Sequence, residues 1–248
     1  MRFTPAVRNI NKLLDIKSMK MLDHYSQFNP SPLTIKQFME FGRTATEEES
    51  FTFLRKEIPV RLSNIMKEIN LLPSNLLQMP SVLILQDWYA QTFRDLVEFE
   101  SSNPTDPEIL ASFCQTLKTV QARHTNVVQT MAQGVLELKE SHTVDKQTDM
   151  AIQYFLDRFY MSRISMRMLI NQHKLLFEPD ADKDTKRIGM IDPSCKVKSV
   201  IMEAFQNAAF LCEEYYDCAP EIEIKGKQEA SHDYLIHHVD CRTNHGEE

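Results

Sequence analysis

Glycine is scarce in this chain of 248 residues. Its five glycines stand at positions 42, 134, 189, 226 and 246, so the closest two are 20 residues apart. A dinucleotide-binding fingerprint needs three glycines within six residues, and a Walker loop needs two glycines and a lysine within seven. These residues can therefore form neither phosphate-binding loop. Tight β-hairpins also favour glycine in the turn, so its scarcity favours a helical fold.

Positive charge, cysteine and long apolar runs are also limited. The 28 lysines and arginines against 35 aspartates and glutamates give a net charge of −7, which disfavours nucleic acid as a general partner. The five cysteines are scattered and form no CxxC pair, so neither a disulfide framework nor a zinc ribbon is indicated. No run approaches the roughly 18 apolar residues of a membrane helix, so we expect no membrane span.

The chain begins with a basic segment. Residues 1–20 hold five lysines and arginines and a single aspartate. This acid-poor pattern is typical of a mitochondrial transit segment. An ordinary basic first helix has the same charge pattern, so charge alone leaves both interpretations open.

Apolar residues recur three or four positions apart over most of the chain, which predicts helices. The expected helices cover residues 34–42, 44–70, 82–101, 107–140 and 146–177. Pro59 should kink or break the second of them. Because the connections are short, an antiparallel four-helix bundle is the most economical fold. The predicted fold class is all-α for most of the chain.

The last part of the chain has a different pattern. Residues 178–194 are polar and without apolar periodicity, which indicates a loop and a domain boundary. Residues 194–217 predict a further helix, and the alternation over 220–224 predicts a strand. One helix and one strand cannot form a sheet domain, so an α/β domain begins here without the rest of its sheet. The expected buried side of this helix comprises Val197, Val200, Ile201, Ala204, Phe205, Ala208, Leu211 and Tyr215.

A histidine and two arginines interrupt the apolar faces of the two longest predicted helices. His124 continues the stripe of residues 107–140, and Arg163 and Arg167 fall on or beside the stripe of residues 146–177. A buried guanidinium without an anion costs several kcal/mol, and arginine offers bidentate geometry to a carboxylate. The three residues predict a pocket for a small anion. A core histidine bonded to a neighbour, with arginines that reach solvent or acidic partners, is the alternative.

Five stretches of the sequence resemble the mitochondrial pyruvate dehydrogenase kinases. They are residues 25–33 (YSQFNPSPL), 53–68 (FLRKEIPVRLSNIMKE), 123–135 (RHTNVVQTMAQGV), 152–177 (IQYFLDRFYMSRISMRMLINQHKLLF) and 189–195 (GMIDPSC). The resemblance covers residues 20–224. It implies a four-helix-bundle regulatory domain over 21–178 and the start of a GHKL-type ATP-binding domain over 188–224. Residues 225–248 match nothing in the family and are expected to form a polar, disordered tail.

The resemblance implies an activity, a location and partners. The family comprises protein-serine kinases of the mitochondrial matrix that use ATP and magnesium and inhibit the pyruvate dehydrogenase alpha subunit, which regulates glucose oxidation. The basic segment 1–20 would then be a transit segment. The implied partners are the lipoyl domain of the acetyltransferase and a second kinase subunit, as a homodimer or as a heterodimer with a full-length kinase.

The family's catalytic glutamate, magnesium-binding asparagine and glycine-rich ATP lid have no match in these 248 residues. We therefore expect neither ATP nor magnesium to bind this chain, and we expect the chain to be inactive alone. Two alternatives stay open. One is a non-catalytic regulatory module that binds lipoyl domains and small carboxylates such as pyruvate, and the other is an unstable structural fragment.

The resemblance also assigns site residues. The lipoyl-binding pocket matches Phe38, Phe41 and Phe53, for which helix core is the alternative. The pyruvate and dichloroacetate pocket matches Leu62, Tyr89, Val120, His124, Ser162, Arg163, Met166, Arg167 and Ile170. In the family, His124 would also lie near the substrate hydroxyl and the catalytic glutamate, a partial catalytic role. Gln121 replaces a common arginine and Thr92 a common serine, so we expect weaker anion binding in which Arg163 carries more of the interaction.

Histidine and cysteine are concentrated in the tail. The candidates are His232, His237, His238, Cys241 and His245. Histidine and cysteine are the preferred zinc ligands, so a zinc site is one interpretation. A short polar tail without a metal is the other, and no metal is expected elsewhere.

Overall fold

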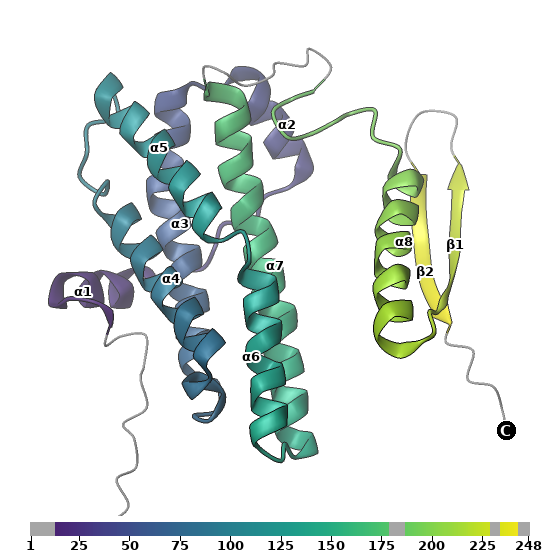
Figure 1. Cartoon of the computed structure of the whole chain (residues 1–248). Helices are drawn as coiled ribbons and strands as arrows, with labels where there is room; N and C mark the ends of the chain where they lie inside the picture. Colours follow the sequence, from purple (N-terminus) through teal and green to yellow (C-terminus); the bar gives the residue numbers. More distant parts are fainter. Residues whose placement is uncertain (1–12, 179–186, 229–233, 243–248) are drawn as a thin grey trace, which may run out of the picture. The chain divides into compact units, whose positions relative to one another are not determined.

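The computed structural model describes residues 13–178, 187–228 and 234–242 (Figure 1). The helices are α1 (Ile16–Tyr25), α2 (Ile35–Thr44), α3 (Glu47–Asn70), the short 3-10 helix η2 (Leu76–Gln78), α4 (Pro80–Val97), α5 (Pro107–Arg123), α6 (Val127–Ser141), α7 (Lys146–Phe177) and α8 (Val197–Tyr216). The strands are β1 (Glu221–Gln228) and β2 (Tyr234–Arg242). The chain divides into two compact units, residues 1–191 and 192–248. The mostly helical fold that the sequence predicts is confirmed.

Several helices of the first unit begin where the sequence supplies a capping side chain. Thr34 and Gln37 form a capping box at α2, and Thr46 and Glu49 form another at α3. Asp145 caps the start of α7 with its carboxylate. These bonds satisfy backbone amides that the first helical turn leaves free, and each stabilises its helix by about 1 kcal/mol.

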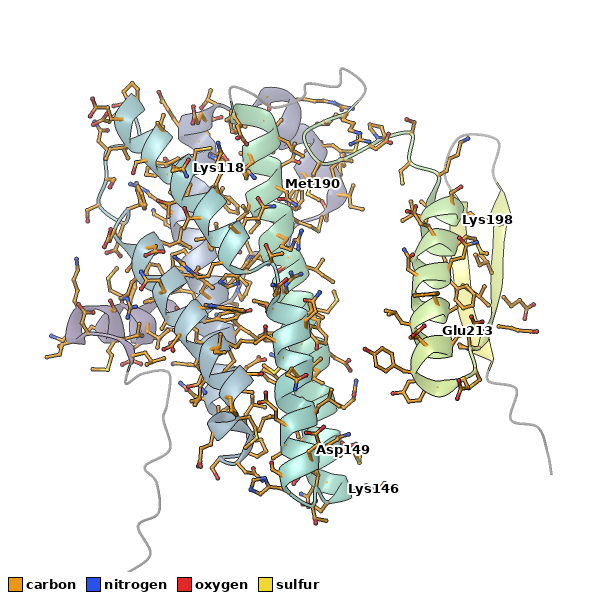
Figure 2. All side chains as sticks on the ribbon, viewed as in Figure 1. Lys118, Lys146, Asp149, Met190, Lys198 and Glu213 are labelled. Carbon is orange, nitrogen blue, oxygen red and sulfur yellow. The ribbon has the colours of Figure 1, made fainter. Side chains whose placement is uncertain are left out.

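The core of the first unit lies among its long helices. α3 packs against α4 and α7, and α4 packs against α6. α5 and α6 follow one another along the length of α7 (Figure 1). The ion pair of Lys139 and Asp149, 2.8 Å long, joins α6 to the first turns of α7, which Lys146 and Asp149 mark in Figure 2. The largest fully buried side chains are aromatic, namely Phe51, Tyr89, Phe93, Phe113 and Phe159.

The helix expected over residues 107–140 is in fact two helices, so that prediction is wrong. The chain leaves the helical conformation between His124 and Asn126, whose ψ angles are 9° and 16°. A break of this kind frees backbone carbonyls that need donors. The Arg163 guanidinium of α7 supplies them, because its Nη2 lies 3.1 Å from the carbonyl oxygen of His124 and 3.2 Å from that of Thr125. A contact from a distant helix therefore stabilises the break.

Pro59 does not break its helix. α3 runs from Glu47 to Asn70 with Pro59 inside it and buried. A proline in a helix interior costs about 3 kcal/mol, since it removes one backbone hydrogen bond and crowds the preceding turn. The apolar stripe of α3 offsets this cost by burial. Its buried members are Phe51, Leu54, Ile58, Leu62, Ile65, Met66 and Ile69.

Gly134 on α6 lies where α4 comes close. A Cβ atom at this position would lie 2.5 Å from Cγ2 of Val82, so a larger side chain must push the two helices apart. We expect Gly134→Leu to lower the free energy of unfolding by about 1–3 kcal/mol in a urea titration. The control is Gln133→Leu, which adds the same side chain at an exposed position of the same helix. An equal loss in both variants would contradict the close contact.

Gln172 of α7 holds the turn that follows the polar segment. Its Oε1 accepts a hydrogen bond of 2.8 Å from the amide of Met190, and its Nε2 donates to the carbonyl of Ile188 at 3.3 Å. Gly189 between them has φ of +59°, a conformation that glycine adopts without strain. Met190 thus lies beside α7 (Figure 2). Residues 188–191, which we expected to start the second domain, therefore belong to the first unit.

The second unit contains α8 and an antiparallel hairpin of β1 and β2. The predicted helix and the strand over 220–224 are confirmed. The expectation of disorder over 225–248 is wrong for residues 225–228, which belong to β1, and for residues 234–242, which form β2 opposite it. The reason lies in composition, because Tyr234, Ile236 and Val239 favour strands. The many polar residues of the tail led us to expect disorder instead.

The expected burial of one side of α8 is also wrong. None of its side chains is buried, and Val200, Leu211 and Tyr215 are among the exposed large apolar residues. A single helix and a two-stranded hairpin offer too little apolar surface to cover such a stripe.

Two expectations fall partly on residues outside the description. Residues 1–12 of the basic segment 1–20 lie outside the described residues. Helix α1 begins at Ile16, within the described part of the segment. His232 and His245 lie outside the described residues as well, whereas His237, His238 and Cys241 stand on β2. Within the described side chains, no three histidine, cysteine or acidic residues form a metal-binding group. None of the helices described is long and apolar enough to cross a bilayer.

Candidate anion-binding site

His124 lies at the junction of α5 and α6, where it is buried. Its Nε2 is 2.9 Å from Oγ1 of Thr92 on α4, and its ring contacts that of Tyr89 with the centroids 4.8 Å apart and the planes inclined by 59°. Burial is the main cause that lowers the pKa of His124 to about 4, and the cations Arg123 and Arg163 add to it. The imidazole is therefore neutral at pH 7.

Arg163 of α7 lies next to this imidazole and is the main cation of the site. One side of its guanidinium donates to the two carbonyls of the α5–α6 junction. Its Nε is buried and has no hydrogen-bond partner among the described residues. Burial, with the nearby Arg167 cation, lowers the pKa of the Arg163 guanidinium. An anion beside Nε would supply the missing acceptor and relieve the repulsion between the two arginines.

A narrow cavity opens between these side chains. Its volume is about 20 Å³, and its lining comprises Ile58, Leu62, Thr92, Val120, Gln121, His124, Arg163, Met166, Arg167, Ile170 and Asn171. A space of this size holds about one water molecule. A small carboxylate would therefore need side chains of the lining to move.

Most of the residues predicted for the anion pocket meet at this cavity. Leu62, Val120, His124, Arg163, Met166, Arg167 and Ile170 line it. Tyr89 does not line it but lies behind His124, and its buried hydroxyl has no partner among the described atoms. Ser162 is not part of the lining. The sequence analysis missed Ile58 and Asn171, although Asn171 stands four positions after Arg167 and shares its helix face.

Gln121 does not present a charge to the cavity. Its Nε2 donates to Oδ1 of Asn171 at 2.8 Å, and its Oε1 accepts from Nζ of Lys174 at 2.6 Å. Both ends of the amide are thus used within the protein. The positive charge of the cavity comes from Arg163 and from the exposed Arg167.

A second cavity lies between α2, α3 and α7. Its volume is about 220 Å³, and its lining comprises Leu33, Gln37, Phe38, Phe41, Ser50, Phe53, Leu54, Leu169, Gln172 and His173. The three phenylalanines that the resemblance assigns to a lipoyl pocket all line it. The lining is mostly apolar, which suits a slender hydrophobic arm.

His173 was missed as a residue of this second cavity. Its Nδ1 lies 2.8 Å from Oγ of Ser50, and its Nε2 is buried without a hydrogen-bond partner among the described residues. Burial lowers the pKa of His173 to about 4. The sequence does contain a pattern that could have identified it. His173 follows Ile170 by three positions and so continues the buried apolar face of α7.

The first unit is thus a helical body with a small cavity beside two arginines and a larger, mostly apolar cavity. The family model described as "Mitochondrial branched-chain alpha-ketoacid dehydrogenase kinase" matches residues 32–192. This match includes both cavities. The chain therefore belongs to the family of mitochondrial pyruvate dehydrogenase and branched-chain alpha-ketoacid dehydrogenase kinases.

Individual relatives agree with this assignment. The chain is 54% identical over 208 residues to the mitochondrial pyruvate dehydrogenase (acetyl-transferring) kinase isozyme 3 of Homo sapiens, which covers 83% of this chain and 51% of the relative. It is 54% identical over 208 residues to the corresponding kinase of Drosophila melanogaster, with 83% and 50% covered. For the kinase of Ascaris suum the values are 50% over 206 residues, with 83% and 51% covered. The chain thus spans about half the length of the curated relatives it matches.

Proposed function

We propose that this chain belongs to a protein-serine kinase of the mitochondrial matrix that phosphorylates and inhibits the pyruvate dehydrogenase alpha subunit. The observation that carries the proposal is the identity of about half of its residues to named pyruvate dehydrogenase kinases. The helices of residues 21–178 would be the four-helix-bundle regulatory domain. Residues 192–224, at the start of the second unit, would begin a GHKL-type domain that binds ATP and magnesium. The kinase would work as a dimer on the complex.

Incubation with Mg·ATP and dephosphorylated pyruvate dehydrogenase tests this proposal. We expect the complete kinase to incorporate phosphate into serines of the alpha subunit and to slow the dehydrogenase. The 248 residues alone are expected to transfer none, because they contain no glycine-rich loop to hold the phosphates. Serine phosphorylation by the 248-residue chain would refute its inactivity, and no phosphorylation by the complete protein would refute the kinase activity.

The cavity beside His124 is proposed to bind a small carboxylate such as pyruvate or dichloroacetate. Three observations support this: a guanidinium with a free buried Nε, a second arginine on the same rim and a buried tyrosine hydroxyl without a partner in the described structure. Because the cavity is small, the carboxylate must draw Arg163 away from the carbonyls of His124 and Thr125. Binding would then loosen the junction of α5 and α6.

A non-catalytic regulatory module is the second candidate function. The observation in its favour is that both cavities lie within the first unit, so carboxylates and lipoyl arms could bind without a nucleotide. Such a module would occupy lipoyl domains and oppose the complete kinase. Titration of the chain with an isolated lipoylated domain of the acetyltransferase tests it, and no binding at high micromolar concentration would reject it.

Phe53 provides a sharper test of the lipoyl pocket. We expect Phe53→Ser to weaken binding of the lipoylated domain about tenfold or more, since it removes an apolar wall of the second cavity. Tyr154→Ser is the control, because Tyr154 is an exposed aromatic of α7 outside that cavity. Isothermal titration with both variants measures the difference. Equal affinities for the two variants would remove Phe53 from the lipoyl site.

A further inference from the structure

A chain of polar contacts runs from the edge of the first unit to the buried imidazole of His124. Asp95 Oδ2 pairs with Nη2 of Arg123 at 2.9 Å, and both side chains are partly exposed. Nη1 of Arg123 donates to Oγ1 of Thr92, also at 2.9 Å. Thr92 is fully buried, and its Oγ1 contacts Nε2 of His124. These four residues come from α4 and from the end of α5.

The direction of each hydrogen bond in this chain follows from what each group can do. A guanidinium only donates, so Oγ1 of Thr92 accepts from Arg123. The hydroxyl hydrogen of Thr92 then needs an acceptor, since a buried donor left without a partner costs about 1–3 kcal/mol. Within the described residues, Nε2 of His124 is the acceptor in contact with Oγ1. Nε2 therefore holds a lone pair.

We propose that Asp95, Arg123 and Thr92 are positioning residues that fix His124 as the neutral tautomer with its proton on Nδ1. The bond that one ring nitrogen makes decides where the proton of the other lies. This inference rests on the proposed carboxylate site only in that His124 lines the same cavity. The consequence for that site is specific. With Nε2 occupied by Thr92, His124 offers a carboxylate no proton at that nitrogen, so Arg163 and the exposed Arg167 are the charged donors that remain.

The threonine itself strengthens the arrangement. Its branched Cβ restricts the first side-chain torsion more than a serine would, so Oγ1 stays aligned between Arg123 and His124. Thr92→Ser keeps the hydroxyl and should keep the tautomer. Thr92→Val keeps the shape and loses the hydroxyl, so it separates hydrogen bonding from packing.

Nitrogen NMR of the histidine side chains in the ¹⁵N-labelled 248-residue chain at pH 7 tests the proposal. The signals of His124 are those that disappear in His124→Gln. In the wild type and in Thr92→Ser we expect protonated Nδ1 and bare Nε2. In Thr92→Val and in Arg123→Met we expect the share protonated on Nε2 to rise about tenfold, the ratio that corresponds to one lost hydrogen bond. Asp95 lies at the outer end of the chain of contacts, so Asp95→Asn should raise the share of His124 protonated on Nε2 by less.

His173 serves as an internal control, because it is also buried and bonds to Ser50 instead. Its signals should stay unchanged in all four variants. A proton on Nε2 of His124 in the wild type, or an unchanged tautomer in Thr92→Val, would overturn the inference. A separate thermal-shift titration with dichloroacetate tests the carboxylate site. If dichloroacetate does not bind but His124 has the expected tautomer, the carboxylate site is rejected and the positioning role of the three residues is retained.

Discussion

Arg163→Gln is expected to abolish the rise in melting temperature that dichloroacetate produces in the wild-type chain. The half-buried guanidinium lines the small cavity, and its buried Nε has no hydrogen-bond partner among the described residues. Loss of a charge-assisted hydrogen bond costs about 1.5–3 kcal/mol, which corresponds to an affinity lower by roughly ten- to a hundredfold. Because stabilisation depends on the ratio of ligand concentration to Kd, the shift should vanish at millimolar dichloroacetate.

Arg158→Gln is the matched control for this experiment. Arg158 lies on the same helix and pairs with Glu68, but it does not line the cavity. Its loss should leave the dichloroacetate shift as in the wild type. Glutamine at position 163 can still donate to the carbonyls of His124 and Thr125, so the variant should fold. A shift of the same size in Arg163→Gln and in the wild type would contradict the anion site.

The stability of the chain should fall steeply between pH 7 and pH 5. His124 and His173 are buried with pKa values of about 4, against 6.5 in the unfolded chain. Below pH 6.5 the unfolded chain binds more protons than the folded one, so stability is lost as the pH falls toward 4 and is full above 6.5. The free energy of unfolding should drop by about 2 kcal/mol for each histidine between pH 7 and pH 5.

Urea titrations at pH 7 and pH 5 measure this difference. His173→Gln should reduce the drop by about half, since one titrating group is removed. His24→Gln is the control, because His24 is exposed on α1. A drop that is the same in His173→Gln as in the wild type would show that this imidazole does not couple to folding.

The sequence predicts the helices of the first unit well because their apolar periodicity is strong and capping residues precede them. Thr34, Thr46 and Asp145 mark the starts of three helices within a residue or two of the expected positions. The break after Arg123 could not be predicted, since residues 107–140 keep their periodicity through it. The break is stabilised by a hydrogen-bond donor from another helix, Arg163. A contact between distant parts of the chain produces no pattern in the local sequence, so it could not be foreseen.

Periodicity and resemblance both led us to expect the residues that line the small cavity, but neither predicts the volume of that cavity. Periodicity places His124, Arg163 and Arg167 on facing helices, and all three line the small cavity. The volume depends on side-chain conformations, such as the turn of Arg163 toward backbone carbonyls. The strand β2 in the tail was not predicted either. It forms by pairing with β1, and the many polar residues of the tail obscured its strand-forming residues.

The Nε–H resonance of Arg163 gives the most direct test of the carboxylate site. This group is buried and has no hydrogen-bond partner among the described residues, so a bound carboxylate should accept from it. Titration of the ¹⁵N-labelled chain with dichloroacetate is predicted to move the Arg163 resonance in a saturable manner while that of Arg158 stays in place. An Arg163 resonance that does not move at millimolar dichloroacetate would contradict the account.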